Sequence, residues 1–287
     1  MEQKQNIITN DELIPSAHNH AKPMLGAGAS SSDDAFDWQS LSGEKILIGL
    51  SGGINSMAVL CQLVESNVKP KELHLFYAHF KEHSPDTFKF VRAGIEFAKA
   101  NFDNVKVKIT RNSILQYFEK SNMIPHPTNS ACSRVLKIEP INRYAFENQI
   151  KIDLVGYVKK EMKTRAEKQQ KNMERTLFSL DKLYPIGEFS DEWCFEIVDR
   201  LIGWHPAIYD IVNEKNKRIF NHNNCLPCKN GYVEDLSNIQ KHFPTEFSNA
   251  MITSQKLSKY WGRSEADFYT TFGRELGQES TCKSCAW

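Results

Sequence analysis

The sequence lacks several features that would assign the protein to a class at once. No apolar run in its 287 residues approaches the ~20 residues of a membrane-spanning helix. The formal net charge is only +1, so nucleic-acid binding would need a local basic patch. The first residues, "MEQKQNIITNDEL", lack the basic start and apolar core of a secretory signal. We therefore expect a cytoplasmic protein with no membrane partner.

Two common nucleotide-binding patterns are also missing. There is no Gly-x-x-x-x-Gly-Lys-Ser/Thr, which excludes the common nucleoside-triphosphate P-loop. No Gly-x-Gly-x-x-Gly follows the first predicted strand, so a dinucleotide-binding fold is not supported. The seven cysteines are expected to be reduced or metal-bound in the cytoplasm.

The order of the hydrophobic patterns predicts an α/β fold. Residues 1–42 are rich in Ala, Ser, Gly and Asn, and we expect them to be disordered. Strand and helix patterns alternate over 43–185, as in a doubly wound parallel sheet with helices on both faces. Residues 186–287 are predicted to be mostly helical, with 191–203 the clearest helix. The predicted strands are 46–50, 72–80, 105–109 and 152–156, and the predicted helices are 56–64, 84–102, 114–120 and 139–148.

The segment "KILIGLSGGINSMAVL" carries the strongest chemical signal. A buried strand ends at Ser51-Gly52-Gly53, and a helix pattern begins at Ser56. Such a turn points backbone N–H groups at one spot, where the helix dipole adds positive charge. Glycine lets an anion approach the backbone closely, and the serine hydroxyls are further donors. The loop is therefore a candidate phosphate site, although an ordinary strand-to-helix turn also uses glycine.

Five segments in order resemble the PP-loop ATP pyrophosphatases, the adenine-nucleotide α-hydrolase-like superfamily. "SGGINS" resembles the SGGxDS pyrophosphate loop of this superfamily. Four later segments resemble its phosphoadenosine phosphosulfate reductase-like branch. These are "ACSRVLKIEPINRY", "DLVGYVKKEMKTR", "YPIGEFSDEWCFEIVDRLIGWHPAIYDI" and "NNCLPCKNG". The resemblance covers residues ~45 to ~245 and implies the PP-loop or HUP-like form of the parallel sheet.

The resemblance implies an enzyme that binds ATP with Mg²⁺ and cuts between the α and β phosphates. An adenylyl group would then pass to an acceptor, either nucleic acid or a small molecule, for sulfur transfer or another modification. The Glu-Cys-Gly-x-His signature of the reductases is absent, which argues against sulfonucleotide reduction. That redox reaction is still an alternative. A non-catalytic nucleotide-binding subunit of a defence or modification complex is another, and a homodimer is equally compatible with the sequence.

Site residues follow from matching these segments to the chain. The resemblance places the phosphates on Ser51, Gly52, Gly53 and Ser56. The leaving pyrophosphate needs further positive charge. The catalytic candidates are Ser51, Asn55, Arg134 and Lys137. The last two are three residues apart and would share one face if their segment is helical. The other nucleotide-binding candidates are His79, Cys132, Gly156 and Arg165, although His79 also suits an ordinary strand end and Cys132 is only placed near the nucleotide.

Asn55 departs from the superfamily pattern, which has a carboxylate at this position. An amide of the same shape keeps its hydrogen bonds but brings no negative charge for Mg²⁺. We expect Asn55 to preserve nucleotide binding and to alter metal-assisted catalysis. The arginine of the branch's Gly-x-Arg segment is likewise absent from Gly156-Tyr157-Val158.

Two C-x-x-C pairs, Cys225/Cys228 and Cys282/Cys285, predict a metal site in the C-terminal region. Together the four thiols suit one tetrahedral Zn²⁺ or a 4Fe-4S cluster. The alternative is a structural first pair with a redox-active dithiol at the tail. The basic stretch 159–175 is a second open case, either a solvated loop, a lid over nucleotide or a nucleic-acid contact.

Overall fold

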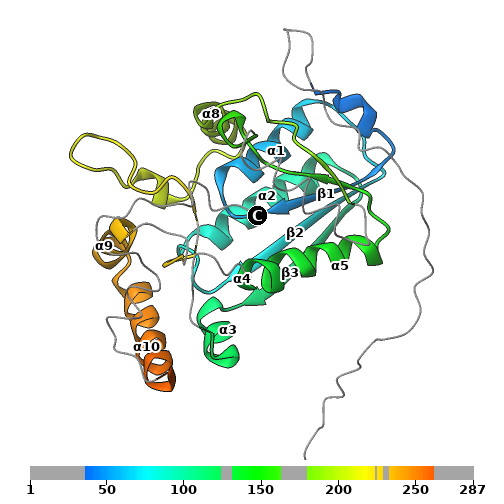
Figure 1. Ribbon diagram of the computed structural model, residues 1–287. Coiled ribbons are helices and arrows are strands. Elements are labelled where there is room, and N and C mark those ends of the chain that lie inside the picture. Colours follow the sequence, from blue (N-terminus) through cyan, green and yellow to red (C-terminus); the bar gives the residue numbers. More distant parts are fainter. Residues whose placement is uncertain (1–35, 124–130, 163–179, 224, 229–232, 262–287) are drawn as a thin grey trace, which may run out of the picture.

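The computed structural model describes residues 36–123, 131–162, 180–223, 225–228 and 233–261. Its centre is a five-stranded sheet in the order β3-β2-β1-β4-β5, with every neighbouring pair parallel. This sheet, with helices around it, confirms the predicted α/β fold (Figure 1). The strands are β1 (Lys45–Leu50), β2 (Glu72–Phe80), β3 (Val105–Asn112), β4 (Ile152–Leu154) and β5 (Asp181–Leu183).

Alternation along the strands divides the core between the two faces of the sheet. Ile46, Ile48 and Leu50 point to one face and pack in the cluster that includes residues of α1, α2 and α8. Leu47 points to the other face and packs with residues of α3 and α5. All four side chains are at most 1% exposed, as expected for parallel strands covered on both faces. The helices are α1 (Ile54–Glu65), α2 (Thr87–Asn101), α3 (Ile114–Ser121), α5 (Glu139–Glu147) and α8 (Asp191–Leu201).

The strand order places the loop after β1 at a topological switch point. The chain runs from β1 through β2 to β3 on one side of the sheet and from β4 to β5 on the other, so the connections that follow the adjacent strands β1 and β4 run in opposite directions. Ligands of open α/β sheets bind in the crevice at such a point. The predicted phosphate loop, Ser51–Ser56, occupies this position.

The C-terminal part is mostly helical, as predicted. Helices α9 (Val233–His242) and α10 (Pro244–Trp261) follow the 3-10 helix η4 (Ala207–Asp210), and α10 packs against α3. Figure 1 shows α9 and α10 leading away from the sheet on the side of α3. Thr253 of α10 donates a hydrogen bond of 2.7 Å to Glu119 of α3. No helix among the described residues is both long and apolar enough to cross a membrane.

The structure differs from the predicted boundaries at three places. Residues 38–41, assigned to the disordered segment, form a 3-10 helix whose Leu41 is 1% exposed. Residues 1–35 lie outside the described residues. Strand β5 was missed, because three residues show no recognisable alternation. Residues 131–138 form the short helix α4 (Ala131–Ser133) and then a π-helical segment, η2 (Arg134–Ile138), which the sequence did not predict.

Candidate functional site

The loop between β1 and α1 is closed by its own serine side chains. The backbone N–H of Ser51 donates to Oγ of Ser56 at 3.0 Å, and the N–H of Gly53 donates to Oγ of Ser51 at 3.1 Å. The two hydroxyl oxygens are themselves 3.0 Å apart. Both serines therefore fix the shape of the loop, and their predicted contact with phosphate stays a prediction.

Three backbone N–H groups of this loop remain free. They are the N–H groups of Gly52, Asn55 and Ser56, which donate no hydrogen bond to any of the residues the structure describes. They belong to the turn and to the first residues of α1, where helix N–H groups have no acceptor within the helix. Buried N–H groups are nearly always paired. Together with the helix dipole, this arrangement suits a phosphate oxygen.

Glycine is required at position 52 for two separate reasons. The backbone of Gly52 has φ +82°, a left-handed conformation that residues other than glycine rarely adopt. A Cβ there would also lie 2.3 Å from Cγ2 of Thr87, the first residue of α2. Gly53 is less restricted, since its φ is −94° and its nearest contact would be Tyr209 Oη at 3.2 Å.

Two residues from the C-terminal part hold the loop in place. The phenol oxygen of Tyr209 accepts hydrogen bonds from the N–H groups of Ile54, at 3.3 Å, and Asn223, at 3.2 Å. Asn223 in turn donates from Nδ2 to the carbonyl of Gly52, at 2.9 Å, and to Thr87 Oγ1, at 2.8 Å. Burial raises the pKa of Tyr209 to about 12, so the phenol is neutral at pH 7. The loop is therefore fixed before any ligand arrives.

Asn55 faces a carboxylate. Its Nδ2 lies 3.5 Å from Oε2 of Glu161, which also accepts from the N–H of Val158 at 3.3 Å. Glu161 ends the short helix α6 (Lys159–Glu161) and is 5% exposed. Gly156 allows this approach, because a Cβ there would lie 2.8 Å from the carbonyl oxygen of Asn55. The predicted residue Gly156 therefore packs directly on the phosphate loop.

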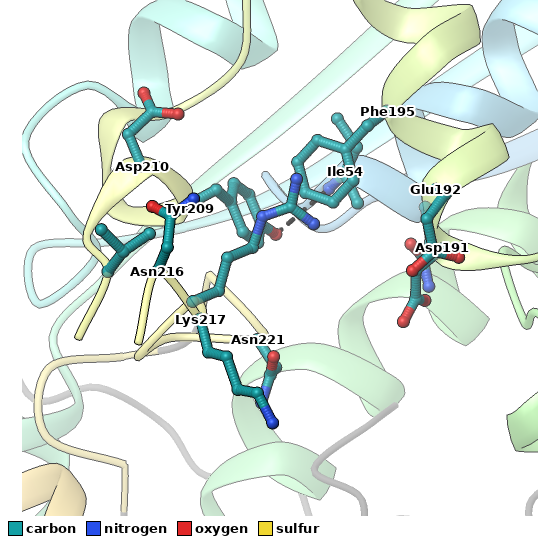
Figure 2. A pocket seen from close by; sticks show the side chains of 12 residues that line it. Ile54, Asp191, Glu192, Phe195, Tyr209, Asp210, Asn216, Lys217 and Asn221 are labelled. Carbon is teal, nitrogen blue, oxygen red and sulfur yellow. Dashed lines mark hydrogen bonds between the residues drawn. The ribbon is translucent and has the colours of Figure 1, made fainter. Parts of the chain in front are cut away.

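A polar pocket of about 590 Å³ opens beside the start of α1. Figure 2 shows Asp191 and Glu192 of α8 on one side and Lys217 and Asn221 on the other. Arg218 also lines the pocket, and its guanidinium carbon lies 3.7 Å from the ring centroid of Phe195. The lining residues are Ile54, Asn55, Asp191, Glu192, Phe195, Tyr209, Asp210, Val212, Asn216, Lys217, Arg218 and Asn221.

Arg134 and Lys137 do not line the pocket beside α1, and their predicted catalytic role stays a prediction. Arg134 is 68% exposed and lies 3.5 Å from Glu139. Lys137 lies over the ring of Phe80, 5.0 Å from its centroid. Their segment is π-helical, with i→i+5 hydrogen bonds and a wider turn, so residues three apart no longer share a face.

His79 is held inside a cluster of aromatic side chains at the end of β2. Its Nδ1 is 3.3 Å from the hydroxyl of Tyr77, which is 3.0 Å from Nδ1 of His83. Burial lowers the pKa of His79 and holds that of His83 well below its ordinary value. Both imidazoles are therefore neutral at pH 7, and His79 has the partners expected of a strand-end histidine.

The cysteine prediction is only partly within the described residues. Cys225 is 4% exposed, and burial raises the pKa of its thiol, while Cys228 is half-buried. Cys132 is buried in the same apolar cluster as Cys225, on the α5 face of the sheet. Cys282 and Cys285 lie outside the described residues, as does Arg165. Within the described part, no three His, Cys, Asp or Glu side chains are placed to hold a metal ion.

The basic stretch is described only at its start. Lys160 forms an ion pair with Asp191, at the start of α8. Lys159 is 74% exposed and 4.0 Å from Glu188. Residues 163–179 lie outside the described part, so the proposed lid or nucleic-acid contact is still a prediction.

Sequence reasoning missed four residues that shape this site: Glu161, Tyr209, Arg218 and Asn223. Tyr209 lies in the quoted segment that resembles the family, so its position was available as a signal. Glu161 is in another such segment. Asn223 begins the segment "NNCLPCKNG", which also resembles the family, but nothing in the local pattern of "KRIFNH" marks Arg218, because its contacts depend on how distant segments meet.

The sequence profile of the phosphoadenosine phosphosulfate reductase domain matches residues 45–201, more than half of the chain. No curated protein sequence gives a significant match.

Three solved structures resemble the chain at low sequence identity. A phosphoadenylyl-sulfate (PAPS) reductase from Candida auris, in a phosphate complex, is 14% identical, with TM-score 0.43 over 62% of this chain and 82% of that one. The U34-tRNA thiolase NcsA from Methanococcus maripaludis, with its 4Fe-4S cluster, is 15% identical, with TM-score 0.43 over 85% and 77%. An NMN synthetase from Francisella tularensis is 12% identical, with TM-score 0.37 over 80% and 84%.

Proposed function

The chain belongs to the phosphoadenosine phosphosulfate reductase domain family of the PP-loop ATP pyrophosphatase superfamily, and on that premise we propose that it is an adenylating enzyme. It binds ATP and cleaves the bond between the α and β phosphates. The adenylyl group passes to an oxygen of a second substrate, and pyrophosphate leaves. That substrate is a nucleobase of a nucleic acid or a small molecule. A nucleophile then attacks the adenylated substrate, and AMP leaves.

One observation carries this proposal: the N–H groups of Gly52, Asn55 and Ser56, in the turn where β1 meets α1, have no acceptor among the described residues. Donors that are fixed before binding stabilise developing negative charge most effectively, because they need no reorganisation during the reaction. Tyr209 and Asn223 supply that rigidity through their hydrogen bonds to Ile54 and Gly52.

Mg²⁺ is the cation that the superfamily pairs with ATP. Mg²⁺ needs only one or two protein carboxylates, since phosphates and waters complete its coordination. Glu161 is the buried carboxylate beside the loop and is the residue we assign to hold the ion. When bound, Mg²⁺ supplies positive charge to the phosphates. Asn55 holds the Glu161 side chain toward the loop.

Zn²⁺ or a 4Fe-4S cluster is our proposal for the cysteine pairs. Cys225 and Cys228 contribute two thiols, and Cys282 and Cys285 would supply the other two. Anaerobic purification, metal analysis and a visible spectrum identify the metal. Under this proposal Cys225→Ser and Cys282→Ser each reduce bound metal. If Cys282→Ser leaves the metal content unchanged, the tail pair is not a ligand.

Sulfonucleotide reduction is the second candidate, and the family match favours it. The C-x-x-C pair Cys225/Cys228 also lies beside the loop after β2, because the N–H of Leu226 donates to the carbonyl of Glu82 at 2.7 Å. Turnover of an adenylylsulfate that depends on a thiol reductant would support it. Tight ATP binding without turnover, with candidate acceptors present, would favour a non-catalytic subunit instead.

The direct test compares two glycine variants that share one backbone conformation. Gly43 has φ +78° and no atom within 4 Å of an added Cβ, whereas a Cβ on Gly52 collides with Thr87. Gly52→Ala should abolish ATP binding and pyrophosphate release, while Gly43→Ala retains both. Calorimetric titration with ATP and Mg²⁺ measures the difference. Equal ATP affinity in the two variants would show that the loop is not the nucleotide site.

A further inference from the structure

The pocket beside α1 contains a guanidinium group that no carboxylate neutralises by direct contact. Arg218 lines the pocket, and among the described residues no Asp or Glu oxygen lies within 4.0 Å of it. Its neighbour Lys217 also lines the pocket without an ion pair in that part of the chain. Two unpaired cations therefore face the same space.

Two of the three carboxylates that line the pocket contact a lysine or histidine side chain. Asp191 forms an ion pair with Lys160, and Asp210 lies 3.0 Å from Nε2 of His205. Only Glu192 is left without an ion pair among the described residues. Three acidic residues line the pocket, and the charge of Arg218 acts on Glu192 without a contact within 4.0 Å, so its guanidinium N–H groups have no direct carboxylate partner among the described residues.

Packing fixes the position of the guanidinium. Its carbon lies 3.7 Å from the centroid of Phe195, close to face contact with the ring. A guanidinium on an aromatic face keeps the N–H groups at its edge available for hydrogen bonds. Phe195 also meets the ring of Tyr209 edge-to-face, with centroids 5.2 Å apart.

Tyr209 connects this cation to the phosphate loop. Its hydroxyl accepts the N–H of Ile54 at 3.3 Å, a contact drawn as a dashed line in Figure 2. The positive charge of Arg218 also acts on this phenol, where it lowers the pKa that burial raises. The pocket that Arg218 lines includes Ile54 and Asn55, so it opens directly at the start of α1.

We propose that Arg218 binds the β and γ phosphates of the nucleotide in this pocket and holds the pyrophosphate as it leaves. This assignment rests on the proposed function and replaces Arg134 as the arginine of the site. The planar fork of arginine matches two phosphate oxygens, and the free N–H groups of the loop hold the neighbouring phosphate. Lys217 is placed to add a second charge at the outer side.

The test uses inorganic pyrophosphate, ATP and AMP as probes in calorimetric titrations of the full chain. Arg218→Met keeps an apolar stem on Phe195 but removes the charge. It should weaken pyrophosphate and ATP binding by about 10- to 100-fold, the range for one hydrogen bond between charged groups. AMP lacks the β and γ phosphates, so its affinity should change by less than about threefold.

Two further variants control for charge and for folding. Lys215→Ala removes a cation from the same hairpin, in which Val212 pairs with Arg218, but one that lies outside the pocket lining, and should leave all three affinities unchanged. Arg218→Lys keeps the charge without the planar fork, so it should recover part of the pyrophosphate affinity. The melting temperature of each variant reports whether the hairpin has remained folded.

The outcomes separate this inference from the proposed function. If the parent protein binds ATP and pyrophosphate and Arg218→Met binds them equally well, Arg218 is not a phosphate ligand and the proposed function stands. If Arg218→Met weakens AMP as strongly as ATP, the residue acts on the whole site and the assignment is wrong. If the parent binds neither ATP nor pyrophosphate, both proposals fail.

Discussion

Restoring the superfamily's carboxylate at position 55 should harm this protein. From sequence alone, Asn55→Asp looks like a repair, since it recovers the SGGxDS pattern. In the structure, the atom that faces Asn55 Nδ2 is the carboxylate oxygen of Glu161, 3.5 Å away. The substitution therefore replaces an amide donor with a second acceptor, beside a glutamate that is 5% exposed.

The magnitude follows from the separation of the two groups. Two like charges about 4 Å apart repel by about 4 kcal/mol at an effective dielectric constant of about 20. Side-chain movement and proton uptake reduce this value, so we expect a loss of roughly 2 kcal/mol in the free energy of unfolding at pH 8. The loss should shrink as the pH falls toward 5, because a proton shared by the pair removes the repulsion.

Denaturant unfolding at pH 8 and pH 5 measures this effect in a double-mutant cycle. Glu161→Gln alone removes the acceptor charge. Asn55→Asp with Glu161→Gln restores one carboxylate and one amide with their positions exchanged, and should recover most of the lost stability. If Asn55→Asp is as stable as the parent at pH 8, the two side chains do not face each other and the argument fails.

Three further predictions concern the supports of the loop. Thr87→Ser removes the methyl group that would lie 2.3 Å from a Cβ at position 52. Added to Gly52→Ala, it should restore part of the ATP affinity that the single variant loses. No recovery would mean that the left-handed φ of Gly52 is the dominant restraint. Asn223→Ala leaves the carbonyl of Gly52 without its donor, so it should lower the free energy of unfolding by about 1–3 kcal/mol and weaken ATP binding. Unchanged ATP affinity would show that this hydrogen bond is dispensable for the site. Burial opposes protonation of His205, but hydrogen bonds to Asp199 and Asp210 outweigh it and raise the pKa of the imidazole. His205→Asn should therefore lower the free energy of unfolding most below pH 6.5, and progressively less as the pH rises above the pKa of the folded state. An equal loss at pH 6 and pH 8.5 would contradict this.

The sheet and its phosphate loop could be predicted because their signals are local. Ile46 to Leu50 form a continuous apolar run, and the glycines that end it stand at adjacent positions. Strand β2 was predicted with the boundaries that the structure has, Glu72–Phe80, since six of its nine residues are apolar and lie close together. The core positions follow from the same pattern.

The supports of the loop could not be predicted, since they depend on contacts across most of the chain. Tyr209 is 155 residues from Ile54, and Asn223 is 171 residues from Gly52. The shared helix face predicted for Arg134 and Lys137 is absent for a different reason. Their spacing implies a shared face only in an α-helix, and the segment adopts π-helical geometry instead. No pattern of residue types marks that change.

The two departures at the loop are better explained as a pair than one at a time. The resemblance calls for a carboxylate at position 55 and an arginine in the segment after Gly156, and this chain has neither. In the structure these positions meet, because Gly156 packs on the backbone of Asn55 and the following residues lead to Glu161. Tyr157 and Val158, which follow Gly156, are buried, at 3% and 0% exposure, and neither adds a charge beside the loop. A carboxylate added at position 55 would face the carboxylate of Glu161, whose Oε2 lies 3.5 Å from the present Nδ2. The amide of Asn55 therefore suits a position that faces a carboxylate in a chain without the arginine of the family segment.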